Sequence, residues 1–178
     1  RVLRDAQGRP VRMSGSNTDI TDRKLVEDAL RMREAQLREF NRVLMNLAVD
    51  ECILGDDFEA AITRFTRITA RTLCVARCSI WLFNEDRSAL ICRNLHETDA
   101  DRHSEGLVIE AAQFPRYLQA LESEQIIAAD DAATDPRTAA FNESYLIPLG
   151  ITSMLDAPLR LRGAIVGVLC HENVGVAR

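Results

Sequence analysis

Residues 145–172 read YLIPLGITSMLDAPLRLRGAIVGVLCHE, and this stretch decides the fold class. Apolar residues dominate 153–161 and again 164–172, and the pair Arg162-Gly163 between them is typical of a tight turn. We therefore predict two long strands joined as a hairpin. Gly167 lies inside the second strand, where a residue without a side chain indicates close packing against a neighbour.

The residues before this hairpin predict further strands and two helices. In order, they are a helix that starts near Asp56 or Asp57, strands over 78–83 and 89–95 around a turn at 84–88, a helix over 113–123, a strand over 125–129 and a loop through 135–137. The first helix carries an apolar stripe, which consists of Phe58, Ile62, Phe65, Ile68, Thr69 and Leu73. This order is typical of an α+β fold, in which helices lie on the faces of an antiparallel sheet.

A long helix is predicted over residues 22–54, because no Gly or Pro interrupts them and Thr21 or Asp22 can cap the first turn. Its apolar residues recur at spacings of four and three, as in a coiled coil. This seam consists of Val26, Leu30, Leu37, Phe40, Leu44 and Leu47, with Arg33 as its polar member. We predict that the helix pairs with a second copy to form a homodimer. The alternative is a helix that packs on its own domain.

Residues 2–4 and 11–18 predict a β-hairpin before this helix. With the Asp19-Ile20-Thr21 that follows, the hairpin resembles the end of a PAS domain and its exit into a signalling helix. The resemblance implies that residues 1–21 are the C-terminal end of a PAS domain and that residues 22–54 are a helical signalling linker.

Composition excludes several classes of protein. The chain has 178 residues and a net charge of −5, and its basic residues are scattered, which argues against a nucleic-acid partner. Its apolar runs are too short to cross a membrane. Five cysteines, an odd number, occur without an export signal, which indicates reduced thiols and a cytoplasmic location. The first residue is not Met, so we expect the chain to be part of a longer protein.

Residues 130–137, 145–158 and 167–172 resemble the GAF domains of sensor histidine kinases and related cyclic-di-nucleotide enzymes. The resemblance implies that residues 55–178 are a GAF domain that lacks its closing helix. It also implies a sensory module that binds a small molecule on one face of the sheet and relays the signal through dimeric helices. The output domain, a histidine kinase or a diguanylate cyclase, would lie downstream in the same chain, so this part would itself be non-catalytic.

The resemblance places a set of residues at the ligand pocket: Trp81, Cys92, Asp131, Phe141, Tyr145, Met154, Asp156 and His171. Cys170-His171 is similar to the Cys-His strand of phytochrome GAF domains. However, Phe141-Asn142 stands where those domains have the Cys-His pair, and a bilin needs that thiol for its covalent bond. We therefore expect no covalent bilin, and the ligand stays unknown.

Metal sites are not predicted. If the 84–88 hairpin turns at Asp86-Arg87, Trp81 faces Cys92 and Cys78 faces Leu95, so the two thiols point to opposite faces of the sheet. His103 lies within a polar segment, 97–105, and His96 lies next to it. Imidazoles could bind haem or a transition metal, but we predict that both are solvated loop residues. Asp130, Asp131 and Asp135 could hold a cation or cap a short helix, and Asp135 before Pro136 favours the start of a turn or helix. The resemblance instead places Asp131 at the rim of the ligand pocket.

Two other functions fit the same residues. A ligand-free dimerisation spacer would fill its pocket with its own bulky side chains, namely Trp81, Phe83, Phe141 and Met154. A methionine sulfoxide reductase of the GAF fold would need thiols on loops near the pocket, whereas the cysteines here lie in predicted helices or strands. Because the chain ends at Arg178, we also expect about 20–25 further residues to add a helix that covers the Phe58 stripe.

Overall fold

The computed structural model describes residues 2–13, 19, 21–48 and 57–175, with the side chains of residues 36, 37 and 39–48 left out. The chain divides into two units, Arg1–Arg42 and Val43–Arg178.

The first unit begins with a β-hairpin, as predicted. Strand β1 (Val2–Arg4) pairs antiparallel with β2 (Pro10–Met13). Both strands are exposed, and the turn is held by Asp5, which accepts hydrogen bonds from the backbone N–H groups of Gln7 and Arg9. Residues 14–18, which the sequence assigns to the second strand, lie outside the described residues.

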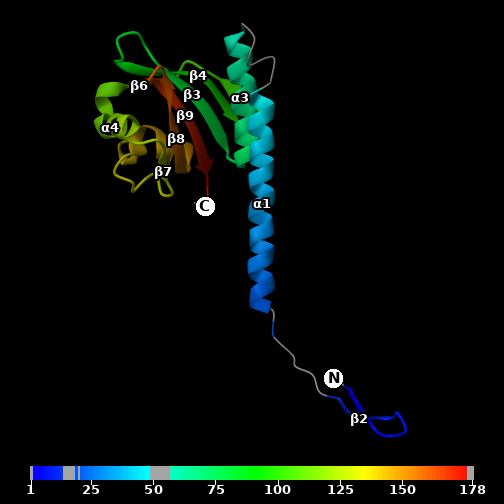
Figure 1. The fold of residues 1–178 in the computed structure, drawn as a ribbon. Helices are drawn as coiled ribbons and strands as arrows, with labels where there is room; N and C mark the ends of the chain where they lie inside the picture. Colours follow the sequence, from blue (N-terminus) through cyan, green and yellow to red (C-terminus); the bar gives the residue numbers. More distant parts are fainter. Residues whose placement is uncertain (1, 14–18, 20, 49–56, 176–178) are drawn as a thin grey trace. The chain divides into compact units, whose positions relative to one another are not determined.

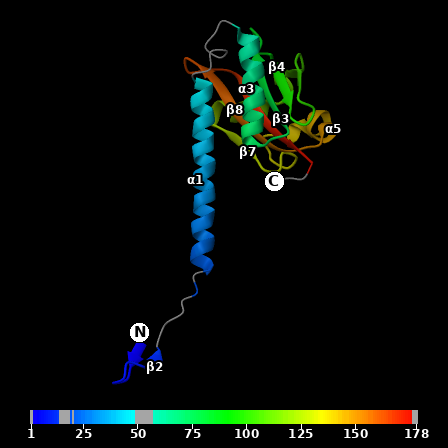
Figure 2. The same ribbon diagram turned by 90° about the vertical axis from the view of Figure 1, so that its right-hand side faces the viewer.

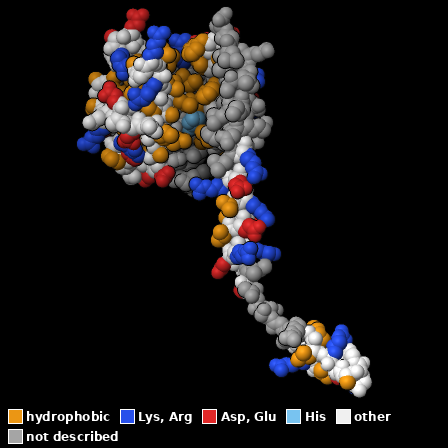
Figure 3. All heavy atoms as spheres, in the orientation of Figure 1, with side chains coloured by type: hydrophobic (Ala, Val, Ile, Leu, Met, Phe, Trp, Pro, Cys, Tyr) orange, Lys and Arg blue, Asp and Glu red, His pale blue; other side chains and the backbone are white. Residues whose placement is uncertain are grey.

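Helix α1 (Thr21–Ala48) follows, with 28 residues. The side chain of Asp19 accepts a 2.9 Å hydrogen bond from the backbone N–H of Thr21, the first residue of the helix, and Thr21 and Asp22, the two cap candidates, lie within its first turn. Acidic and basic side chains alternate along the described part of the helix (Figure 3), and some form ion pairs one turn apart, such as Glu27 with Arg31. Among the predicted seam residues, Val26 and Leu30 are 69% and 56% exposed. Leu37, Phe40, Leu44 and Leu47 lie outside the described side chains.

The second unit is built on an antiparallel sheet of seven strands (Figure 1). The strands are β3 (Arg77–Phe83), β4 (Ala89–Glu97), β5 (Arg102–Ser104), β6 (Val108–Glu110), β7 (Ile127–Ala129), β8 (Ile151–Leu161) and β9 (Ala164–Val174). Their order is β5-β4-β3-β9-β8-β7, and β6 pairs with β4. Strands β8 and β9 form the long hairpin predicted from the sequence, and Arg162 and Gly163 turn it with positive φ angles of 52° and 87°.

Helices cover both faces of this sheet, which confirms the predicted α+β class (Figures 1 and 2). One face carries α3 (Phe58–Leu73), whose first turn is capped by the side chain of Asp57. The opposite face carries α4 (Pro115–Ser123) and a series of short turns, namely η1 (Ala111–Gln113), η2 (Ala139–Phe141), η3 (Asn142–Leu146) and α5 (Ile147–Leu149). The main hydrophobic core lies between the sheet and this second layer.

A β-bulge in the β3–β4 pair changes one predicted register. Trp81 faces Cys92 as predicted, but the register shifts between Ile80 and Trp81, so Cys78 faces His96 rather than Leu95. An extra residue in one strand leaves one position unpaired, and sequence alternation alone does not reveal it. Cys78 and Cys92 still lie on opposite faces of the sheet, as the sequence suggests.

The sequence predicts solvated loop residues at His96 and His103, and this prediction is wrong. Strand pairing continues beyond Leu95, so β5 aligns His103 with His96. His96 is fully buried on the face that α3 covers, its ring lies 4.6 Å from that of His103, and its Nε2 is 3.0 Å from the Asp101 carboxylate.

An apolar groove runs along α3. Its volume is about 410 Å3. The residues that line it come from α3 and from the strands beneath: Phe58, Ala61, Ile62, Phe65, Ile80, Leu82, Leu159 and Val166. Phe58, at the start of the predicted stripe, is 50% exposed.

Candidate ligand-binding site

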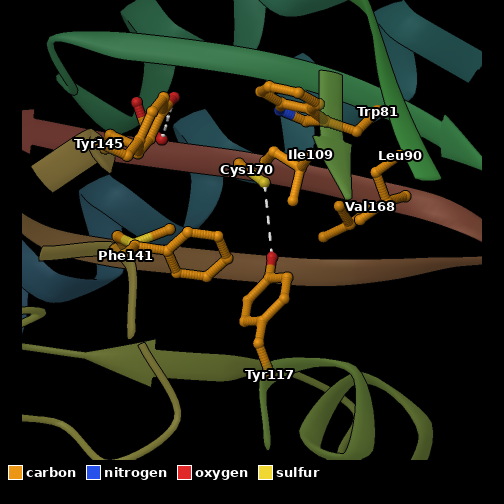
Figure 4. A pocket seen from close by; sticks show the side chains of 10 residues that line it. Trp81, Leu90, Ile109, Tyr117, Phe141, Tyr145, Val168 and Cys170 are labelled. Atoms are coloured by element: carbon orange, nitrogen blue, oxygen red, sulfur yellow. Dashed lines mark hydrogen bonds between the residues drawn. The ribbon is translucent and has the colours of Figure 1, made fainter. Parts of the chain in front are cut away.

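A small cavity lies between the sheet and the layer of α4 and the short turns (Figure 4). Its walls come from nearly every element on this side: Trp81, Leu90, Ile109, Tyr117, Phe141, Tyr145, Met154, Val168, Cys170 and Glu172. The empty space at its centre is about 10 Å3, which is room for about one water molecule. The protein's own side chains therefore fill most of the site.

Phe141 is the central aromatic residue of this site. Its ring stacks on that of Phe114 with centroids 4.0 Å apart and planes 13° apart, and the ring of Tyr117 meets it edge-on at 4.9 Å. Such stacked and edge-to-face contacts are favourable arrangements of aromatic rings. Phe141 is carried by η2 and is followed at once by the π-turn η3, a type of winding that is common at functional sites.

A buried carboxyl group lies behind this aromatic layer. Asp156 on β8 is fully buried, and its Oδ2 accepts a 2.6 Å hydrogen bond from the hydroxyl of Tyr117. Its Oδ1 is buried and has no hydrogen-bond partner. Burial raises the pKa of Asp156 to about 7, because a charged carboxylate is costly to remove from water. Burial also raises the pKa of Tyr117 and of the neighbouring Cys170 thiol.

A second buried carboxyl group, Glu172 on β9, is fully hydrogen-bonded. Its Oε2 accepts from Arg77 Nε at 2.9 Å, and its Oε1 accepts from the hydroxyl of Tyr145 at 2.9 Å. The Arg77 guanidinium also donates to Tyr145 and lies over its ring. Burial raises the pKa of Glu172, although Arg77 opposes this by favouring the charged form. The positive charge of Arg77 is thus matched by Glu172.

The structure brings most of the predicted site residues together. Trp81, Phe141, Tyr145 and Met154 line the cavity. Cys92 and Asp156 are buried on the same face of the sheet but do not reach the cavity surface. Burial raises the pKa of the Cys92 thiol to about 12, so this thiol is a poor nucleophile near neutral pH.

Two predicted residues lie elsewhere. His171 pairs with Cys78 across β9 and β3 and points to the α3 face, because neighbouring residues of a strand alternate between faces. Its neighbour Glu172 is the residue that lines the cavity. Asp131 is exposed, and its carboxylate accepts the backbone N–H of Ala133, so it stabilises a turn.

Sequence reasoning missed Tyr117, Glu172 and Arg77. The sequence does contain a signal for Glu172. It lies two residues after Cys170 and four after Val168 on the predicted last strand, and such residues share one face of a sheet. Tyr117 lies in the predicted helix over 113–123, but the sequence does not show which helix face meets the sheet. Within the described residues, no group of three or more His, Cys, Asp or Glu side chains is placed to hold a metal ion.

Residues 57–177 match the family model described as the GAF domain. The chain belongs to the GAF family. Solved structures of low sequence identity share the fold. One is the GAF domain of a phosphoenolpyruvate-protein phosphotransferase from Acinetobacter, at 16% identity and a TM-score of 0.55, covering 78% of this chain and 77% of that one. Another is the phycocyanobilin-bound GAF domain of a cyanobacterial phytochrome, at 18% identity and a TM-score of 0.58, covering 79% and 80%.

A third similar structure is the chromophore-binding domain of a bacteriophytochrome from Stigmatella aurantiaca, at 14% identity and a TM-score of 0.58, covering 81% of this chain and 53% of that one. No curated protein sequence is significantly similar to this GAF chain. Among the described residues, no helix combines the length and the apolar character needed to cross a membrane.

Proposed function

We propose that this chain is the sensory part of a signal-transduction protein and that its GAF domain binds a small molecule. The observation that carries the proposal is the aromatic cavity with two buried carboxyl groups beside it, Asp156 and Glu172. Apolar walls with few buried polar groups of shifted pKa are typical of small-molecule sites. The phycocyanobilin in a similar GAF domain supports the same kind of role.

We further infer that α1 pairs with α1 of a second copy. The helix leaves Val26 and Leu30 exposed, and these two residues lie four positions apart in a heptad seam whose spacings alternate between four and three. A paired helix of this length can transmit a small change in a sensor domain as a rotation or a shift. The output domain, a histidine kinase or a diguanylate cyclase, would follow in the same cytoplasmic protein, and the N-terminal hairpin would be the end of a PAS domain.

We expect this part of the protein to be non-catalytic. The buried thiols of Cys78 and Cys92 each have a pKa raised to about 12 by burial, and that of Cys170 is raised as well. Such thiols are poor nucleophiles near neutral pH, which argues against the sulfoxide reductase alternative.

Native mass spectrometry of the protein as purified tests ligand binding. A sensor that retains its ligand should give an additional mass, which is released when the protein is denatured. The masses of the bound and the denatured protein then give the mass of the ligand. A bound metabolite on every molecule would support the proposal.

A ligand-free spacer is the second candidate, and the small cavity favours it. With about 10 Å3 of empty space between its lining side chains, Phe141 among them, the site has no room for a metabolite unless a side chain moves. If native spectra show the bare protein and added metabolite mixtures leave the melting temperature unchanged, the spacer is the better account. Because the cavity is so small, ligand binding would require a lining side chain such as Phe141 to move.

A further inference from the structure

Asp156 has an unused hydrogen-bonding atom in the interior. One carboxyl oxygen accepts from Tyr117, whereas the other, Oδ1, is buried without a partner. A buried acceptor without a donor is costly because it has lost its hydrogen bonds to water, so nearly all buried polar atoms have a partner in the protein or in an ordered water molecule. The nearby cavity holds about one water molecule at most, and Asp156 lies behind its wall, next to the lining residue Tyr117. A ligand that enlarged the cavity beside Tyr117 could supply the missing donor.

Acidic groups outnumber basic groups around the cavity. Arg77 is paired with Glu172, and no Lys, Arg or His of the described part of the chain forms an ion pair with Asp156. The groups that act on Asp156 are the Tyr117 hydroxyl, the Cys170 thiol and the acidic Glu172. A carboxylate or phosphate that entered the cavity would therefore meet two acidic groups and no free cation.

The shape of the site indicates a flat ring. The phenyl group of Phe141 lies on Phe114 and against the edge of Tyr117, so the site already holds one planar ring between aromatic neighbours. If Phe141 swings out with η2, a ligand ring can take its place. That ring would contact Tyr117, whose hydroxyl donates a hydrogen bond to Asp156.

Building on the proposed function, we propose that the ligand of this GAF domain is a small planar aromatic molecule that carries a cationic or N–H donor group. Its ring replaces the side chain of Phe141, and its donor group binds Asp156 Oδ1. The domain would thus select against anionic metabolites.

Three probes of one shape test this inference: benzamidine, benzamide and benzoate, which are cationic, neutral and anionic. Phe141→Ala opens the space of one ring, and Phe141→Leu is a milder variant in case the first does not fold. By isothermal titration calorimetry, we expect benzamidine to bind either variant at least about tenfold more tightly than benzoate, with benzamide between them. Wild-type protein should bind benzamidine more weakly than the variants, because Phe141 must first be displaced.

Asp156→Asn provides the decisive comparison. The amide oxygen still accepts from Tyr117, but the other atom becomes an N–H donor, so the preference for benzamidine over benzoate should fall by about tenfold or more. Asp131→Asn is the matched control, because this carboxylate is exposed and lies outside the cavity. It should leave the preference unchanged. Burial raises the pKa of Asp156 to about 7, so benzamidine, which stays charged, should bind more tightly as the pH rises from about 6 to about 8.

The outcomes separate this inference from the proposed function. Equal or tighter binding of benzoate, or an unchanged preference in Asp156→Asn, overturns the inference. An anionic molecule found bound in native mass spectra also overturns it while leaving the proposed function intact. If no probe binds and native spectra show only the bare protein, both the inference and the proposed function fail.

Discussion

The hydroxyl of Tyr117 donates a 2.6 Å hydrogen bond to Oδ2 of Asp156, and both side chains are buried. This bond joins α4 to β8 and therefore connects the helical layer to the sheet. Because Asp156 has no cationic partner among the described residues, its protonation is coupled to the stability of the domain.

Asp156→Asn should become more stable relative to wild type as the pH rises. A buried acid whose pKa is raised to about 7 keeps its proton in the folded state at pH values where the unfolded chain has lost it. The free energy of unfolding of the wild type therefore falls between about pH 4 and about pH 7, by up to about 1.4 kcal/mol per pH unit. The Asn side chain does not titrate, so the variant does not show this fall. Urea unfolding at several pH values measures the difference. If the two curves stay parallel, Asp156 is not a buried titrating group.

Arg77→Met should destabilise the domain by about 3–5 kcal/mol, because it leaves Glu172 buried without a cation. The double variant Arg77→Met/Glu172→Leu should recover much of this loss, since both charges are then gone. Breaking the exposed pair of Arg102 and Glu97 with Arg102→Met should cost less than about 1 kcal/mol. Chemical unfolding of all variants measures these costs, and additive losses in the double variant would contradict the coupling.

Gly167→Ala should destabilise the sheet by about 1–3 kcal/mol or more. A Cβ at this position would lie 2.0 Å from the carbonyl oxygen of Trp81 and 3.0 Å from the Cα of Leu82, so β3 and β9 would have to separate. Val174→Ala, on the same strand but 45% exposed, is the control and should change stability by less than about 0.5 kcal/mol. Thermal melts compare the two, and equal melting temperatures would show that the strands adjust freely.

Val26→Glu/Leu30→Glu should convert a dimer into monomers, because like charges would face each other in the proposed seam. Met32→Glu/Ala35→Glu is the matched control, since it places the same charges on the same helix outside the seam. Multi-angle light scattering gives the mass of each variant. A seam variant that still has the mass of a dimer would place the interface elsewhere.

Co-expression with bilin synthesis should give protein without a covalent chromophore. Phe141 stands where related domains carry the thiol, its ring packs against Phe114, and burial raises the pKa of the thiols of Cys92 and Cys170. Zinc-induced fluorescence on a denaturing gel detects a covalent bilin. A fluorescent band would mean that one of these thiols becomes accessible and reactive.

The sequence by itself determined the class of fold and the order of most strands and helices along the chain. The apolar residues over 153–161 and 164–172 and the turn at Arg162-Gly163 are local properties, so the β8–β9 hairpin could be predicted without any knowledge of its neighbours. Helix α3 likewise follows from its own apolar stripe and its cap at Asp57. Trp81, Phe141, Tyr145 and Met154, whose positions the family resemblance supplied, line one cavity, and their role in ligand binding stays a prediction.

The tertiary structure alone decided which polar groups meet. The bulge at Ile80–Trp81 set the β3–β4 register, the burial of His96 depended on a strand pairing beyond Leu95, and the bond of Tyr117 to Asp156 joins residues 39 positions apart. Such contacts depend on how strands align and on which helix face meets the sheet. The free energy of a buried carboxyl group depends on those distant partners, so its pKa and the chemistry of this site are properties of the folded domain.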